Sequence, residues 1–184
     1  MDSSLESFLD QPVRGFLDQL AARTPTPGGG GAAAVTGAMA AGLVAMAARF
    51  SDKRLPGAGD MAAAADELRG RLTALVDLDA RAYQAVLALR TREALHEAAV
   101  VPLEIAEIGA RIAAMAVQVA ETGNPNLRGD AMTGAVLAAA SARSAAALVD
   151  INVGLGKLEP ELSRLAAQAA ADAGDAAERV SRER

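Results

Sequence analysis

Two acidic residues inside a helix-forming stretch are the first candidates for chemistry. Asp77 and Asp79 lie between Val76 and Tyr83, and aspartate is a poor residue for a helix interior. On a helix, Asp79 shares a face with Val76 and Tyr83, whereas Asp77 points about 160° away. A carboxylate among such neighbours can have a raised pKa, as a general acid or base requires. The alternative is a solvated surface pair of Asp79 and Tyr83, because charged groups on helices are mostly exposed.

A glycine run after two Thr-Pro pairs is the second candidate. Pro27, Gly28, Gly29 and Gly30 precede a long apolar segment. Bare N–H groups at a helix start, with the positive end of the helix dipole behind them, suit a carboxylate or phosphate. The same glycines could instead form a tight turn that lets helices pack closely. The residues alone leave the two readings about equal.

The third candidate is the turn that contains Asn126 and Asp130. An asparagine amide can hold a heterocycle through paired donor and acceptor contacts. Asp130 could bind a ring nitrogen or cap the next helix, and capping is the better supported role. His96, the one histidine, has no visible partner and is expected at the surface.

Composition predicts an all-α single domain over residues 1–184. The chain has 47 alanines but 3 Phe, 1 Tyr, and neither Trp nor Cys, and strong helix formers dominate every long segment. One histidine and no cysteine cannot build a zinc site, so we expect no metal. A four-helix carboxylate metal protein needs pairs of Glu-x-x-His motifs, which one histidine cannot supply.

Charge and hydropathy argue against nucleic-acid and membrane partners. The net charge is −5, from 18 basic and 23 acidic residues, and scattered basic residues argue against nucleic-acid binding. The N-terminus lacks the pattern of a signal peptide, so we expect a cytoplasmic protein. No charge lies between Arg23 and Arg49, yet this stretch is mostly Ala and Gly. It therefore predicts a buried central helix and no membrane span.

Breakers divide the chain into about six helices of a bundle. We expect them at residues 4–23, 28–50, 60–89, 92–121 and 127–153, and from 160 to a frayed tail at 178–184. Pro102 should kink the fourth helix. The helices at 28–50 and 127–153 are apolar nearly all round, which predicts a symmetric homodimer that buries their small-residue faces against each other. On the first of them, that face carries Gly37, Ala41, Ala45 and Ala48.

Five segments, in this order, resemble the cyclodeaminase/cyclohydrolase family, which comprises the cyclodeaminase domain of formiminotransferase-cyclodeaminase and stand-alone methenyltetrahydrofolate cyclohydrolases. They are the Thr-Pro-Thr-Pro-Gly-Gly-Gly-Gly turn, residues 77–83, Val101-Pro102-Leu103, residues 123–130 and Asp150-Ile151-Asn152-Val153. The resemblance covers nearly the whole chain and implies an all-α bundle that forms a dimer.

The resemblance also implies a reaction on a tetrahydrofolate substrate. A cyclodeaminase converts 5-formiminotetrahydrofolate to 5,10-methenyltetrahydrofolate and ammonia, and a cyclohydrolase hydrolyses the methenyl compound to 10-formyltetrahydrofolate. The catalytic aspartate of the family falls on Asp79 or Asp77, and its helical neighbours favour Asp79. The folate site implied by the resemblance consists of the residues Pro27, Gly28, Gly29, Gly30, Tyr83, Asn126 and Asp130. We further expect the helix start to bind a glutamyl carboxylate of the substrate.

Two departures from the family pattern keep an alternative open. Gly31 stands where members usually have Ser, and Leu89 is followed directly by Arg90-Thr91-Arg92 in place of a Leu-Pro-Lys loop. Arg90 or Arg92 could replace that lysine as a folate contact, although guanidinium and ammonium groups are not interchangeable. The alternative is a non-catalytic helical dimer that binds a small ligand or acts as a scaffold. The site prediction fails if Asp79 faces bulk water far from the glycine turn.

Overall fold

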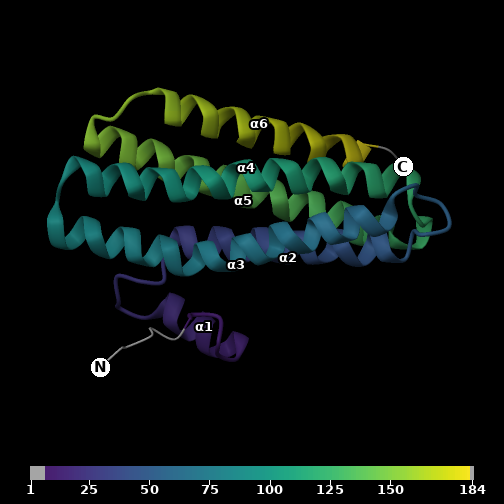
Figure 1. Ribbon diagram of the computed structural model, residues 1–184, viewed down its shortest axis with the longest axis horizontal. Helices are drawn as coiled ribbons and strands as arrows, with labels where there is room; N and C mark the ends of the chain where they lie inside the picture. Colours follow the sequence, from purple (N-terminus) through teal and green to yellow (C-terminus); the bar gives the residue numbers. More distant parts are fainter. Residues whose placement is uncertain (1–6, 183–184) are drawn as a thin grey trace.

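Long helices lying side by side form the body of the protein (Figure 1). The computed structural model describes residues 7–182, which contain helices and no strand. The elements are α1 (Val13–Ala21), α2 (Gly29–Arg49), α3 (Ala58–Leu89), α4 (Arg92–Thr122), the short 3-10 helix η1 (Pro125–Leu127), α5 (Arg128–Gly156) and α6 (Glu161–Arg182). The predicted all-α fold with six α-helices is therefore confirmed for these residues.

The first helix is shorter than predicted and lies apart from the long helices in Figure 1. It begins at Val13 rather than Ser4, because Pro12 occupies the N-cap position and residues 8–11 form turns and bends. Ser4 and Leu5 lie outside the described residues. Phe16 is buried and joins the hydrophobic core, so α1 is held to the bundle by its apolar side.

Small residues set the distance between the central helices. A Cβ added to Gly37 of α2 would lie 2.8 Å from Ser141 Oγ of α5 and 3.1 Å from Leu72 Cδ1 of α3. Gly134 of α5 faces Val44 of α2 in the same way, at 3.2 Å. Ser141 Oγ donates a hydrogen bond to the Ala33 carbonyl at 2.7 Å, so the close contact also satisfies a buried hydroxyl.

These contacts correct one expectation about the homodimer. The face of α2 that carries Gly37, Ala41, Ala45 and Ala48 is buried inside this chain, because other helices of the same bundle pack against it. The outward sides of α2 and α5 carry larger apolar side chains instead. Those at least 39% exposed are Met39, Met132, Val136, Ile151 and Leu155.

Two helical segments are long and apolar enough to cross a membrane by length and composition alone. They are Gly29–Arg49 and Pro125–Gly156, with 61% and 44% of their apolar windows buried in the bundle. A core helix that is apolar on all sides meets the same criterion.

The end of the chain is more ordered than predicted. Residues 178–182 continue α6, and Val180 is 1% exposed. Arg179 Nη2 lies 2.6 Å from Glu121 Oε1 near the end of α4. The expected fraying is therefore wrong up to Arg182, because an apolar anchor and an ion pair hold this turn; residues 183–184 lie outside the described part.

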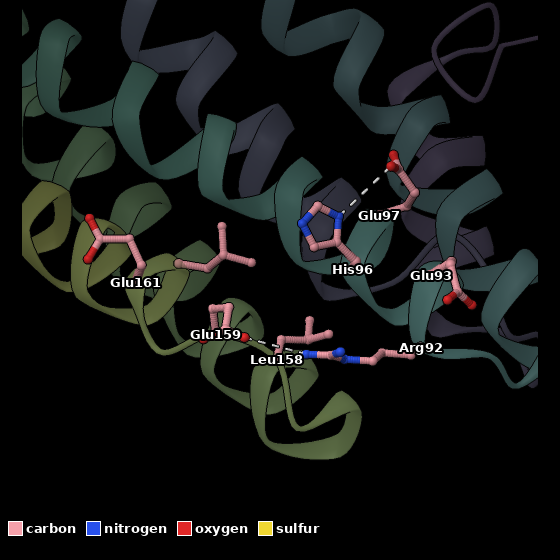
Figure 2. A pocket seen from close by; sticks show the side chains of 8 residues that line it. Arg92, Glu93, His96, Glu97, Leu158, Glu159 and Glu161 are labelled. Carbon is pink, nitrogen blue, oxygen red and sulfur yellow. Dashed lines mark ion pairs between the residues drawn. The ribbon is translucent and has the colours of Figure 1, made fainter.

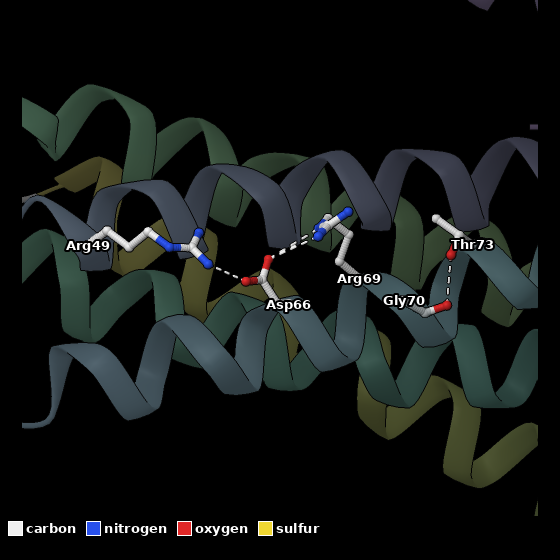
Figure 3. Close-up of polar contacts among 5 residues, drawn as sticks. All are labelled: Arg49, Asp66, Arg69, Gly70 and Thr73. Carbon is white, nitrogen blue, oxygen red and sulfur yellow. Dashed lines mark hydrogen bonds and ion pairs between the residues drawn. The ribbon is translucent and has the colours of Figure 1, made fainter.

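A surface ion-pair cluster joins α2 to α3 (Figure 3). Asp66 of α3 accepts hydrogen bonds from Arg49 of α2 and, at 3.1 Å, from Arg69 of its own helix. Both hydrogen bonds lower the pKa of Asp66, and the bond from Arg49 has the larger effect. Exposed pairs of this kind contribute little to stability, so buried packing holds the two helices together.

The glycines of the bundle separate into close contacts and open positions. A Cβ on Gly109 of α4 would lie 3.0 Å from the Ala138 carbonyl oxygen and 3.0 Å from Ala142 Cβ, whereas Gly70 has nothing within 4 Å. We expect Gly109→Ala to lower the free energy of unfolding by about 1–3 kcal/mol through overpacking. The matched control Gly70→Ala should raise it by about 0.5–1 kcal/mol, as alanine is the better helix former. Urea unfolding followed by circular dichroism measures both, and equal stabilisation by the two would contradict the close crossing.

Candidate active site

The carboxylate of Asp79 lies at the start of α2. The Gly31 N–H donates a hydrogen bond to Asp79 Oδ2 at 3.1 Å. A Cβ on Gly30 would overlap the same carboxylate, so the missing side chain of Gly30 is what lets Asp79 reach the helix end. The first turn of α2 has no side-chain cap of its own, and Asp79 of α3 serves in its place.

A cleft of about 420 Å³ opens next to this contact. Its walls come from the loop before α2 and from α2, α3, α4 and α5, and Asp79 is the one charged side chain among them. The lining residues are Pro25, Thr26, Gly28, Gly29, Gly30, Asp79, Tyr83, Val86, Ala98, Leu148, Ile151, Asn152 and Leu155. The structure thus brings Asp79, Tyr83 and three predicted glycines into one site.

Partial burial controls the protonation of Asp79. Burial raises the pKa of this carboxyl group, and the hydrogen bond from Gly31 opposes that rise. The positive end of the α2 dipole acts in the same direction as Gly31. A carboxyl group with a raised pKa at the wall of a cleft can both accept and return a proton. Asp79 is partly buried and accepts the Gly31 N–H, so it is not part of a solvated surface pair with Tyr83.

Asp77 lies outside the cleft and binds the N-terminal segment. Its Oδ1 accepts a hydrogen bond from the Phe8 N–H at 3.0 Å, and it does not line the cleft. The helical phase therefore separates the two aspartates as predicted: Asp79 faces the cleft and Asp77 anchors the N-terminal segment. Of the two predicted catalytic residues, the geometry supports Asp79 alone.

Asn126 and Asp130 lie at the end of the bundle opposite to the glycine turn of the same chain. Asn124, two residues before Asn126 in the same turn, donates its N–H to Ser51 Oγ at 2.8 Å, and Ser51 lies just past the end of α2. The 21 residues of α2 span about 30 Å, so this end is remote from the glycine turn. Placing Asn126 and Asp130 in the same cleft is wrong for a single chain. Asp130 lies in the first turn of α5 but makes no cap hydrogen bond.

Pro27 and Gly31 support the site from outside its lining. Pro27 is buried under the turn, and a Cβ on Gly31 would meet Pro27 Cβ and Val76 Cγ1 at an ordinary 3.6 Å. A Cβ at position 31 would therefore fit. The hydrogen bond to Asp79 uses the Gly31 backbone, so the absence of a serine leaves this contact intact. The helix start binds the protein's own carboxylate there, in place of the expected substrate carboxylate.

Asn152 is a lining residue that the sequence analysis did not select. It belongs to α5, and its Nδ2 donates a hydrogen bond to the Ala98 carbonyl of α4 at 2.7 Å. The available signal was a polar residue within the motif Asp150-Ile151-Asn152-Val153, near the end of an otherwise apolar helix. Spacing alone could not reveal which helix it faces.

A second, more exposed hollow of about 530 Å³ lies between the start of α4 and the turn from α5 to α6. Figure 2 shows Arg92 pointing toward Glu159 across it, and their closest atoms are 3.7 Å apart. Arg92 also donates to the Lys157 carbonyl at 3.3 Å. It is therefore engaged at this turn and does not line the cleft. His96 is about half exposed, 4.0 Å from Glu97, as expected for a surface residue.

The turn from α3 to α4 consists of two residues, as expected from the missing loop. Arg90 has a left-handed backbone conformation with φ of 53°. Thr91 caps α4, because its side-chain oxygen accepts a hydrogen bond from the Ala94 N–H. No arginine or lysine from the described part of the chain lines the cleft. The described residues therefore offer no cationic side chain to an anionic ligand group inside the cleft.

The raised pKa of Asp79 predicts a gain in stability for Asp79→Asn. An acid whose pKa is raised by folding stabilises the fold below its unfolded pKa, and this contribution is lost as pH rises through the folded pKa. At neutral pH the burial of this acidic group therefore destabilises the wild type, and the neutral amide removes this penalty while its oxygen still accepts the hydrogen bond from the Gly31 N–H. We expect a higher melting temperature for Asp79→Asn at pH 7 and a smaller difference at pH 4. Thermal unfolding at both pH values checks this, and a variant less stable at pH 7 would contradict the assigned burial effect.

Comparisons with known proteins give the family and the fold. The profile of the family described as formiminotransferase-cyclodeaminase matches residues 12–171. A methenyltetrahydrofolate cyclohydrolase of Methylorubrum extorquens is 34% identical over 78% of this chain and 79% of its own length. The mouse formimidoyltransferase-cyclodeaminase is 31% identical over 65% of this chain, which spans only 26% of that protein.

A solved structure has the same fold. It is a formiminotetrahydrofolate cyclodeaminase from Thermotoga maritima, with a TM-score of 0.85, 29% identity, and coverage of 92% of this chain and 93% of that one. The profile match covers most of the chain, and the cyclohydrolase is similar over nearly four fifths of both sequences. The chain belongs to the formiminotransferase-cyclodeaminase family of folate one-carbon proteins.

Proposed function

We propose that the protein hydrolyses 5,10-methenyltetrahydrofolate to 10-formyltetrahydrofolate. The observation that carries this proposal is a partly buried carboxyl group with a raised pKa, Asp79, as the one charged side chain lining an otherwise uncharged cleft. The methenyl bridge of the substrate carries a delocalised positive charge between N5 and N10. A lone carboxylate in such a cleft attracts this cation and is not offset by a second charge.

In the proposed reaction, Asp79 moves one proton. Its carboxylate takes a proton from a water molecule while the water oxygen attacks the methenyl carbon, giving a tetrahedral carbon between N5 and N10. The bond from this carbon to N5 then breaks, and Asp79 returns the proton to N5. The remaining hydroxyl proton leaves to solvent and a formyl group stays on N10. Proton transfer by a carboxylate requires no metal.

The fold neighbour from Thermotoga maritima supports a second candidate reaction. In a cyclodeaminase, N10 attacks the carbon of the protonated formimino group, and ammonia leaves from the tetrahedral carbon. Asp79 would pass the N10 proton to the leaving nitrogen. Hydrolysis remains our first choice, because the cyclohydrolase of Methylorubrum extorquens is 34% identical to this chain and the Thermotoga maritima cyclodeaminase is 29% identical.

Replacement of the two aspartates tests the role of Asp79. We expect Asp79→Asn to lower kcat by about 10²–10⁴-fold, the contribution typical of general acid–base catalysis. Asp77→Asn keeps the side-chain size outside the cleft and is the control, with an expected change below about threefold. The measurement is the decay of the methenyl chromophore, with ammonia release from 5-formiminotetrahydrofolate measured in parallel. Wild-type protein that accelerates neither reaction would support the non-catalytic alternative.

A substitution at Gly30 tests the position of the Asp79 carboxylate without changing the charge of the site. A Cβ at this position displaces the Asp79 carboxylate from the start of α2. We expect Gly30→Ala to lower kcat/KM by about 10²-fold, because small misplacements of a reacting group have large effects. Gly31→Ala adds the same atom with ordinary contacts and should lose much less activity. Equal losses in the two variants would contradict the proposed Asp79 position.

We also propose a homodimer that covers the outward sides of α2 and α5. These helices pack against each other, and their outward sides expose Met39, Met132 and Val136. No charged residue of α2 precedes Arg49, and exposed apolar surface shared by two helices is typical of an interface. We expect Val136→Glu to shift the mass in analytical ultracentrifugation from dimer to monomer. A monomeric wild type would refute this proposal without bearing on the chemistry.

A further inference from the structure

Pro102 leaves one backbone carbonyl of α4 without its helical partner. In an α-helix the N–H of each residue bonds to the carbonyl four residues earlier, and proline has no N–H. The carbonyl of Ala98 therefore lacks the bond that position 102 would supply. Ala98 is 7% exposed and Pro102 is fully buried, so water has little access to replace that bond. A buried carbonyl in this state requires another donor.

Asn152 of α5 supplies that donor. Its Nδ2 lies 2.7 Å from the Ala98 oxygen. Because a carbonyl can only accept, this bond identifies which side of the amide is nitrogen and fixes the amide orientation. Among residues 7–182, no group donates a hydrogen bond to Asn152 Oδ1. Both Asn152 and Ala98 line the cleft that contains Asp79.

We infer that Asn152 binds an N–H donor of the heterocycle in the cleft, and that Pro102 is the positioning residue that holds Asn152 for this contact. This inference rests on the proposed folate reaction. The reduced pterin ring carries N–H donors away from N5 and N10, where the reaction takes place. An acceptor already fixed in orientation binds such a donor without losing side-chain freedom on binding. It also discriminates against ligands that lack the donor.

A double-mutant cycle on KM tests both parts of the inference. Asn152→Ala removes the acceptor, and we expect KM for methenyltetrahydrofolate to rise about tenfold while kcat changes less than about threefold. Pro102→Ala restores a backbone N–H that bonds to Ala98 and competes with Asn152 for this carbonyl. The Asn152 amide is then less firmly held, so KM should rise about three- to tenfold. In the double variant, KM should equal that of Asn152→Ala, because Pro102 acts only through Asn152.

Stability provides a readout that does not depend on activity. Asn152→Ala leaves the Ala98 carbonyl unpaired and should lower the melting temperature, whereas adding Pro102→Ala should restore it. If Asn152→Ala folds too poorly for kinetics, Pro102→Ala and the double variant, in which Ala98 is paired, are each compared with the wild type, which alone keeps the contact. In that comparison we expect closely similar KM values, both above that of the wild type.

Each outcome decides the inference. The positioning role of Pro102 would be overturned if the KM increase of the double variant equalled the product of the two single increases. A wild-type KM in Pro102→Ala would overturn it as well. A wild-type KM in Asn152→Ala would overturn the ligand contact. Wild-type protein without turnover overturns the proposed function and this inference together, whereas turnover by the wild type with unchanged KM values overturns the inference alone.

Discussion

The contact between Asp79 and the start of α2 is the constraint on which the site depends. A carboxylate from α3 accepts the Gly31 N–H and occupies the space that a side chain at position 30 would need. This contact caps a helix that has no side-chain cap of its own. It also leaves the carboxylate partly buried, which raises its pKa. Helix capping and the proposed proton transfer therefore depend on the same carboxylate, and Gly30 is required for it to reach the helix start.

Close helix packing keeps this contact in place. Gly37 and Gly134 bring α2 and α5 together at distances that larger residues would forbid. Polar side chains satisfy backbone groups within and next to the packed helices, as in the bond from Ser141 to the Ala33 carbonyl and that from Asn152 to Ala98. A densely packed interior resists deformation, so the cleft has fixed walls on several helices.

The cleft contains one charge and several apolar and amide groups, which fits a substrate whose reacting part is a cation. Arg92, one of two arginines considered as a substitute for the missing lysine, instead holds the α5–α6 turn. The side chain absent at Gly31 is not needed, because the Asp79 contact uses the backbone. These two departures from the family pattern therefore leave the proposed chemistry at Asp79 intact.

Residue types and spacing were enough to predict the all-α fold, six helices and the helix face that carries Asp79, because helix propensity, breakers and helical phase are local properties. They were also enough to separate Asp79 from Asp77. Which groups meet across the bundle depends on how the helices pack: the glycine turn meets Asp79, whereas Asn126 and Asp130 lie about one α2 length, roughly 30 Å, away. The burial of the small-residue face within one chain, and the meeting of Asn152 with Ala98, were likewise decided by tertiary packing. Sequence periodicity tells which face of a helix is apolar or small, but only the packed bundle determines which helix covers it.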